Sequence, residues 1–376
     1  MGSRPVITRG LSGYLDLLRF GAAFVVLLSH FAYTRFTDGQ YSFIRELNLG
    51  SDAVVLFFVL SGFVITFAAT QKDKTAGPFA FSRLTRLWSV AMPALALVLV
   101  FDGWGVKVNP EFYLDTPYYN TVGALEYWWR GLTFSSHWAG DTLRLGSNGP
   151  YWSLSYEAAY YIAFGIFLYL SGLLRWLALG LCALIFGLKI WLLAPAWFMG
   201  VGLYIVLSRA DFRRYSALMV KLMIVTPIFI YILCQMMGLP ETLRVLTYVL
   251  IGPEQFAKLG FSDEFIWNAL IGALFTLHLF GVSILLSGRV TDFHWQAAVK
   301  WLAGGSFSLY LVHYPVLQWG GAIMPSTGIW VLDDILLLSI VCLICYGFAA
   351  IFERPLPYFR KAILMRYSRR NAVQTL

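Results

Sequence analysis

Long apolar runs recur along almost the whole chain, and they restrict its fold more than any other feature. A helix of roughly 20 apolar residues spans the hydrocarbon core of a bilayer. We place about ten such spans in this sequence, with approximate limits 12–34, 51–70, 87–104, 150–171, 174–192, 195–208, 217–238, 265–287, 301–323 and 331–352. The runs therefore predict an all-α polytopic membrane protein with no fused soluble domain.

The composition agrees with this fold class. Charged residues make up 13% of the chain and hydrophobic residues 59%, whereas soluble domains are about 25% charged. The first apolar run is too long for a cleavable signal and lacks a small-residue cleavage site, so we expect it to remain as a membrane helix. We treat residues 1–376 as a single transmembrane domain that ends in a basic tail at about 354–376.

The distribution of basic residues predicts the topology. With ten spans and a cytoplasmic N-terminus, 18 of the 28 Lys and Arg residues fall on the cytoplasmic side and seven in the outside loops. Such a bias is typical of membrane proteins. We therefore expect a multi-pass protein of a bacterial-type inner membrane with both termini in the cytoplasm. The formal charge of +8 then reflects topology and does not indicate a nucleic-acid partner.

The first span carries three ionisable residues, Asp16, Arg19 and His30. An ionisable residue at membrane depth is costly, so it is a functional candidate by default. Arg19 and His30 are eleven residues apart, which places them on one helix face about 16 Å apart. Asp16 lies within pairing reach of Arg19. The alternative is a buried Asp–Arg bridge with a core histidine bonded to a neighbouring helix.

A second candidate lies in YWSLSYEAAYY, residues 151–161. Glu157 is about two turns into the fourth span and needs a polar partner at that depth. It approaches from the same side of the membrane as His30, so the two are predicted to act as base and orienting group. A structural hydrogen bond is the alternative. Its neighbours Ser153, Tyr156 and Tyr160 are candidates for a substrate-binding or structural role.

Other polar positions interrupt the apolar pattern. Arg83 and Arg86 point the same way at the cytoplasmic boundary, where their guanidiniums suit a diphosphate, although simple anchoring to the membrane surface is by itself the commoner explanation for such a pair. Asp52 suits the start of the second span as a helix cap. His313 lies near the middle of the ninth span, and Glu353 ends the last one. No metal-ligand motif is present, and we expect no metal.

Several of these pieces occur in the order typical of the acyltransferase-3 family of integral membrane acyltransferases. The chain resembles that family in Arg19 and His30 of the first helix, FFVLSGF at 57–63, the R-x-x-R pair Arg83 and Arg86, WSLSYE at 152–157, SLYLVHYP at 308–315 and ERP at 353–355. The resemblance covers nearly the whole chain. It departs at RLTRLWSV, because the proline that often follows the second arginine comes later here, at Pro93.

The resemblance implies transfer of an acyl group from cytoplasmic acyl-CoA, with acetyl-CoA the expected donor, to a hydroxyl of a glycan or lipid-linked saccharide. It implies that Arg83 and Arg86 bind the CoA phosphates and that Arg19 lines the path of the thioester arm. His30 is then the base or a transient acyl carrier, tuned by Glu157 or Asp16.

Two other functions fit the same residues. Buried ionisable groups also mark the paths of secondary transporters and flippases, although the inverted repeats of many transporters are not visible here. A polytopic glycosyltransferase would need acidic metal ligands on the outer side, for which only Asp333 and Asp334 are available. The long aromatic outer segment 105–149 is either a binding element over the site or an interfacial amphipathic helix.

Overall fold

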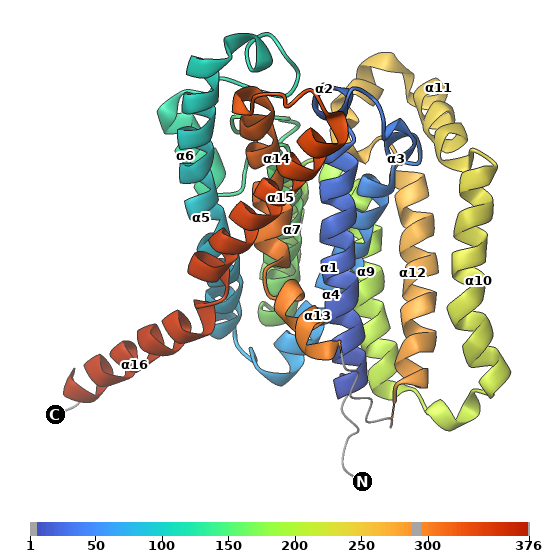
Figure 1. Ribbon diagram of the computed structural model, residues 1–376. Helices are drawn as coiled ribbons and strands as arrows, with labels where there is room; N and C mark the ends of the chain where they lie inside the picture. Colours follow the sequence, from blue (N-terminus) through green and yellow to red (C-terminus); the bar gives the residue numbers. More distant parts are fainter. Residues whose placement is uncertain (1–5, 288–294, 375–376) are drawn as a thin grey trace.

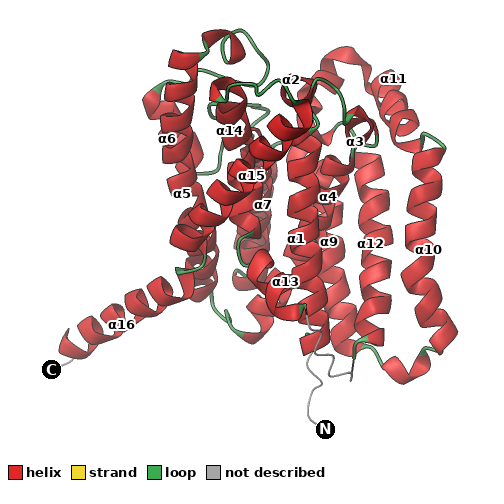
Figure 2. Ribbon diagram, viewed as in Figure 1, coloured by secondary structure: helices red, strands yellow, loops and turns green. Residues whose placement is uncertain are grey.

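The computed structural model describes residues 6–287 and 295–374, with side chains up to residue 365. Helices and short connections make up this part of the chain, without a β-sheet (Figure 2). Seven segments are long and apolar enough to cross a membrane by length and composition. The predicted all-α membrane fold is therefore confirmed.

Each predicted span coincides with a helix. The helices are α1 (Arg9–Phe31), α4 (Leu49–Gln71), α5 (Ala76–Val108), α7 (Trp152–Tyr169), α8 (Gly172–Phe186), α9 (Leu188–Arg209), α10 (Ala217–Met236), α12 (Phe265–Leu285), α14 (Ser306–Ile323) and α15 (Trp330–Phe348). They run alternately up and down in one bundle (Figure 1). We call the end where the N-terminus lies in Figure 1 the lower end, and the opposite end the upper end.

Two boundaries differ from the prediction. The fifth and sixth spans were separated at Pro195, but the break lies at Gly187, and α9 continues through Pro195. Gly187 adopts φ +81°, a conformation that only glycine takes easily. The upper segment 239–264 contains a helix, α11 (Leu239–Leu259), with a kink at Gly252.

The centre of the bundle is closely packed because small residues lie where α4 meets α9. A Cβ on Gly62 would lie 2.0 Å from the carbonyl oxygen of Trp197, and a Cβ on Gly200 would lie 2.0 Å from that of Val59. Helix backbones approach this closely in membranes only through small residues. The contact holds α4 and α9 in one register, and Ser61 on α4 enters the site described below.

Shorter helices close the two ends. At the upper end lie α2 (Thr34–Thr37) and α3 (Ser42–Glu46), while α6 (Ala124–Leu132), followed by the loop 133–148, packs along the side of α5 (Figure 1). At the lower end, α13 (Gln296–Ala303) precedes α14, and a π-helical turn, η5 (Ala349–Glu353), leads into α16 (Leu356–Gln374). Among the basic residues used for the topology, Arg4 and Arg289 lie outside the described residues.

Candidate active site

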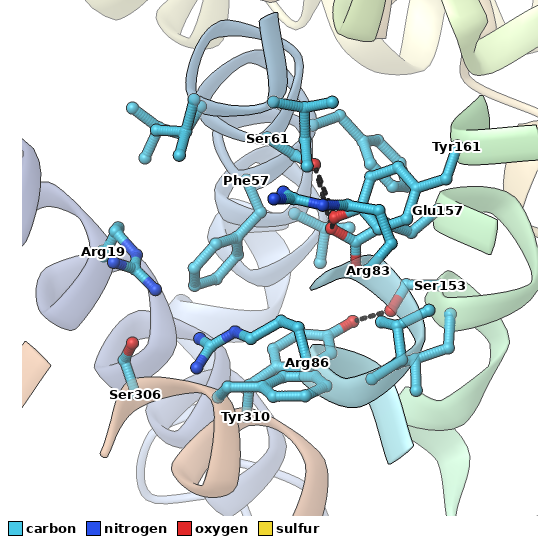
Figure 3. A pocket seen from close by; sticks show the side chains of 18 of the residues that line it. Arg19, Phe57, Ser61, Arg83, Arg86, Ser153, Glu157, Tyr161, Ser306 and Tyr310 are labelled. Atoms are coloured by element: carbon cyan, nitrogen blue, oxygen red, sulfur yellow. Dashed lines mark hydrogen bonds between the residues drawn. The ribbon is translucent and has the colours of Figure 1, made fainter. Parts of the chain in front are cut away.

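The lower cavity is a space of about 330 Å³ within the bundle. Arginines line it from three helices: Arg19 on α1, Arg83 and Arg86 on α5, and Arg360 on α16. Figure 3 shows Arg19 facing Arg83 and Arg86 across the space. Guanidiniums gathered in this way supply many N–H donors of the kind that bind phosphate groups.

Each arginine of the R-x-x-R pair has one carboxylate partner. Arg83 Nη2 lies 2.9 Å from Asp73, and Arg86 Nη1 lies 3.1 Å from Glu353. Glu353 also accepts hydrogen bonds from the backbone N–H and the hydroxyl of Ser308 in the first turn of α14. A guanidinium has five N–H donors, so these contacts orient both arginines and leave donors for a ligand.

Arg360 is a cationic residue of the cavity that the sequence analysis counted only as part of the basic tail. Its Nε donates to the hydroxyl of Thr85 at 2.7 Å, and its Nη2 donates to the carbonyl of Ser82. Both partners lie on α5, next to Arg83 and Arg86. The contacts fix the start of α16 against α5 and bring its guanidinium into the pocket.

Asp16 and Arg19 lie on one helix face, as predicted, with 3.9 Å between Oδ1 and Nη1. Arg19 lines the lower cavity, whereas Asp16 does not. The pair orients Arg19, and Asp16 has no direct contact with the upper site.

Glu157 also lines the lower cavity. Its carboxylate accepts a hydrogen bond from Ser61 at 2.9 Å and another from Tyr161. Trp197 in turn donates its indole N–H to Ser61 at 3.3 Å. This network supplies the polar partners that a carboxylate needs at membrane depth.

The upper cavity is larger, about 670 Å³, and His30 lines it. Its wall also includes residues of α3, the start of α4, the loop 133–148 and the turn before α12. Edge-on rings flank His30 on two sides: the centroid of Tyr33 is 5.4 Å away and that of Tyr314 is 5.1 Å away. His30 therefore has a rigid aromatic setting at the floor of an open, polar space.

His313 is the residue that orients His30. Nδ1 of His30 lies 2.8 Å from Nε2 of His313, and Nδ1 of His313 lies 2.9 Å from the carbonyl oxygen of Leu309. A carbonyl only accepts, so in the neutral pair His313 donates from Nδ1 and accepts at Nε2. His30 must then donate from Nδ1, which leaves Nε2 as its basic nitrogen.

The structure does not pair Glu157 with His30. The two side chains line different cavities, and Glu157 is bonded to Ser61 and Tyr161. The prediction of Glu157 as the orienting group of His30 is corrected accordingly. The reason is rotational: Glu157 faces Ser61 of α4, while the ring of His30 faces α14.

A thin partition separates the two cavities. Val54 and Tyr310 line both of them. The hydroxyl of Tyr310 donates to Ser153 at 2.8 Å, and Phe57 packs edge-on against its ring at 5.5 Å. Ser153 therefore holds the side chain that stands between the arginine pocket and the histidine pair.

Three other candidates have structural contacts and line neither cavity. Asp52 is buried and accepts hydrogen bonds from Tyr231, Gln235 and Trp267, which joins α4 to α10 and α12. Tyr156 shares a hydrogen bond with Ser262, and Tyr160 donates to the carbonyl of Ile190. Asp52 is thus a junction between three helices.

Four residues of the upper cavity were not singled out from the sequence: Arg45, Arg144, His137 and Asn148. Arg45 lies in the short helix α3 and the other three lie in the loop 133–148, and the only signal that favoured any of them was the length of the segment 105–149. Trp128 and Trp129 of that segment belong to the amphipathic α6 and line neither cavity. The loop after α6, rather than its aromatic helix, forms the site.

Comparison with known proteins gives a consistent result. The model of a family described as an acyltransferase domain matches residues 12–354. The chain is 30% identical over 152 residues to "Acyltransferase MdmB" of Streptomyces mycarofaciens, covering 39% of this chain and 36% of that protein. It is 26% identical over 156 residues to "O-acetyl transferase" of Shigella phage Sf6, covering 41% and 45%.

Both matches span less than half of the relative's own length. No solved structure matches significantly. The family match includes α5, α7, α14 and nearly all of α1, but it stops at residue 354. Arg360 lies beyond it.

Proposed function

Because the chain belongs to the acyltransferase-3 family of membrane acyltransferases, we propose that it moves an acyl group, acetyl in the simplest case, from cytoplasmic acyl-CoA to a hydroxyl of a glycan or lipid-linked saccharide. The lower cavity takes the donor and the upper cavity takes the acceptor. The observation that carries this proposal is the arrangement of an arginine pocket and a histidine pair on opposite sides of one partition.

The donor site follows from charge. The CoA phosphates bind to Arg83, Arg86 and Arg360 at the lower end, and the pantetheine arm extends past Arg19 toward Tyr310. The excess of basic residues at the lower end supports a cytoplasmic location for this side, where acyl-CoA is made. Glu157 remains in this cavity as a group that shapes the path of the arm.

In the chemical step, which takes place at the partition, the thioester of acyl-CoA is converted to an oxygen ester of the acceptor. Nε2 of His30 takes the proton of the acceptor hydroxyl, the oxygen attacks the thioester carbonyl, the C–O bond forms and the C–S bond breaks. The proton passes from His30 to the leaving sulfur and gives free CoA. A neutral imidazole suits this role because it takes and returns a proton near neutral pH.

The direct test uses purified protein, acetyl-CoA labelled in the acetyl group, and a panel of glycans and lipid-linked saccharides. We expect alkali-labile label on a hydroxyl acceptor with one free CoA released per ester. The transporter alternative predicts proton-coupled uptake into liposomes without covalent change. Uptake of that kind, with all label still on CoA, would reject the proposal.

Replacing His313 by glutamine should lower kcat by about 10- to 100-fold, because a lost hydrogen bond between side chains costs about 1.5–3 kcal/mol when it orients a charged transition state. The affinity for acetyl-CoA should stay unchanged, since His313 does not line the lower cavity. The matched control is His278→Gln: His278 is a buried histidine bonded to Tyr14 and the carbonyl of Ile224, away from both cavities. Equal losses in both variants would indicate a general packing defect.

Replacing Arg360 by glutamine should weaken acetyl-CoA binding by about tenfold, as expected for one charge-assisted contact with phosphate. The effect should vanish with acetyl-pantetheine, which has no phosphate. Lys361→Gln, at an exposed position of the same helix turn, is the control. A titration in which the Arg360 variant binds acetyl-CoA like the wild type would exclude α16 from the donor site.

A further inference from the structure

The upper cavity has positive charge without a counter-charge close to His30. Arg45 and Arg144 both line it. Arg45 donates to the hydroxyl of Ser29 at 3.1 Å, and neither arginine forms an ion pair with a described carboxylate. Outer loops of membrane proteins are normally poor in basic residues, so two unpaired guanidiniums here need an explanation.

Each of the two guanidiniums contacts a tyrosine ring that also packs against His30. Arg45 lies over the ring of Tyr33 at 4.3 Å, and Arg144 lies over the ring of Tyr314 at 5.9 Å. The same two rings pack edge-on against His30. Each guanidinium is therefore separated from the His30 ring by one tyrosine ring.

The acidic residues of the same cavity are already satisfied. Asp263 pairs with Arg244 at 2.8 Å. Glu264 accepts hydrogen bonds from Asn48 at 2.8 Å and Ser51 at 3.4 Å. One carboxylate of the cavity is thus paired with an arginine and the other is hydrogen-bonded to neutral side chains, and both directly precede α12.

Unpartnered polar side chains point to a ligand independently of the arginines. Asn148 is 1% exposed and lines the cavity, yet neither its amide nitrogen nor its oxygen has a hydrogen-bond partner. Nδ1 of His137, 4% exposed, also lacks one. Burial, with Lys189 and Arg144 nearby, lowers the pKa of His137 to about 3, so its ring is neutral at pH 7 and suits a hydroxyl rather than an anion.

We propose that the acceptor carries an oxyanion, a carboxylate or a phosphate, close to the hydroxyl that is acylated, and that Arg45 and Arg144 bind this group. Asn148 and His137 bind neighbouring hydroxyls of the same molecule. The inference rests on the proposed function, in which the upper cavity takes the acceptor, and it narrows the acceptor to an acidic saccharide or a saccharide phosphate.

The test measures thermal stabilisation of the purified protein by three probes, with the donor site saturated with CoA so that phosphate cannot bind there. The probes are methyl glucuronide, glucose 1-phosphate and the neutral methyl glucoside. We expect at least one anionic probe to raise Tm in a concentration-dependent way and the glucoside to be much weaker. Whether methyl glucuronide or glucose 1-phosphate gives the larger rise in Tm shows whether the site prefers a carboxylate or a phosphate.

Arg45→Gln and Arg144→Gln should each weaken the binding of the anionic probe by about tenfold and leave the binding of the glucoside unchanged. Arg130→Gln is the matched control, because Arg130 lies on α6, is paired with Asp141 at 2.7 Å and does not line the cavity. The inference would be overturned if all three probes raised Tm equally, or if none of them changed it. So would arginine variants that slow acyl transfer to neutral and anionic acceptors by the same factor, because the arginines would then serve the transition state.

The outcomes separate the inference from the proposed function. Acyl transfer to a neutral acceptor, with no dependence on an anion, keeps the function and rejects the anion site. Anion-dependent stabilisation lost in the arginine variants, with no acyl transfer to any acceptor, keeps the anion site and rejects the function.

Discussion

Replacing His30 by glutamine should lower kcat for acyl transfer by about 10²–10⁴-fold, the usual value of general-base assistance. Glutamine retains polarity at the floor of the upper cavity but has no basic nitrogen to take the proton of the acceptor. The affinity for acetyl-CoA should not change, because the arginine pocket lies across the partition of Val54 and Tyr310.

The measurement is the rate of labelled ester formation at saturating acetyl-CoA, together with an acetyl-CoA titration of the same preparation. Unaltered binding shows that the variant is folded. His278→Gln serves again as the control at a buried histidine outside both cavities. Wild-type turnover in the His30 variant would show that His30 is not the general base.

The second large effect concerns the donor. The double variant Arg83→Gln, Arg86→Gln should weaken acetyl-CoA binding by about 10²–10⁴-fold, since two charge-assisted contacts with phosphate are lost at about 1.5–3 kcal/mol each. It should have no comparable effect on binding of the acceptor, which occupies the other cavity.

The double substitution also leaves the buried carboxylate of Glu353 without its cation. A second variant is therefore needed to separate lost phosphate contacts from misfolding. Arg83→Lys, Arg86→Lys keeps both charges but loses the bidentate fork, and we expect intermediate affinity in a well-folded protein. Arg213→Gln is the control, at a lower-end arginine whose side chain is 89% exposed. Wild-type acetyl-CoA affinity in the double glutamine variant would rule out this donor site.

Much of the fold could be predicted because a bilayer makes hydropathy decisive. The apolar runs locate the ten helices, since each must satisfy its own backbone within the hydrocarbon core. The break between α8 and α9 was misplaced because Pro195 is a strong local signal, whereas the backbone turn depends on φ at Gly187. A proline inside a helix with packed neighbours is tolerated in membranes.

The site could be predicted in part. Spacing along one helix was sufficient to predict that Asp16 lies beside Arg19 and that Arg83 and Arg86 face the same cavity. The pairing of His30 with His313 joins helices 283 positions apart, and no local pattern specifies which side chains meet across a bundle. Arg360, Arg45 and Arg144 were missed for a related reason: in sequence they look like ordinary solvated charges, and only the packing of α16 and of the upper loops brings them to a cavity.

In the proposed function the acyl group passes from the lower, cytoplasmic side of the membrane to the upper side, while CoA remains on the side where it bound. Reconstituted proteoliposomes that hold labelled acetyl-CoA inside, with an impermeant acceptor outside, test it directly. We expect His30-dependent label on the external acceptor, with free CoA retained in the lumen. Labelling only when donor and acceptor share one compartment would contradict it.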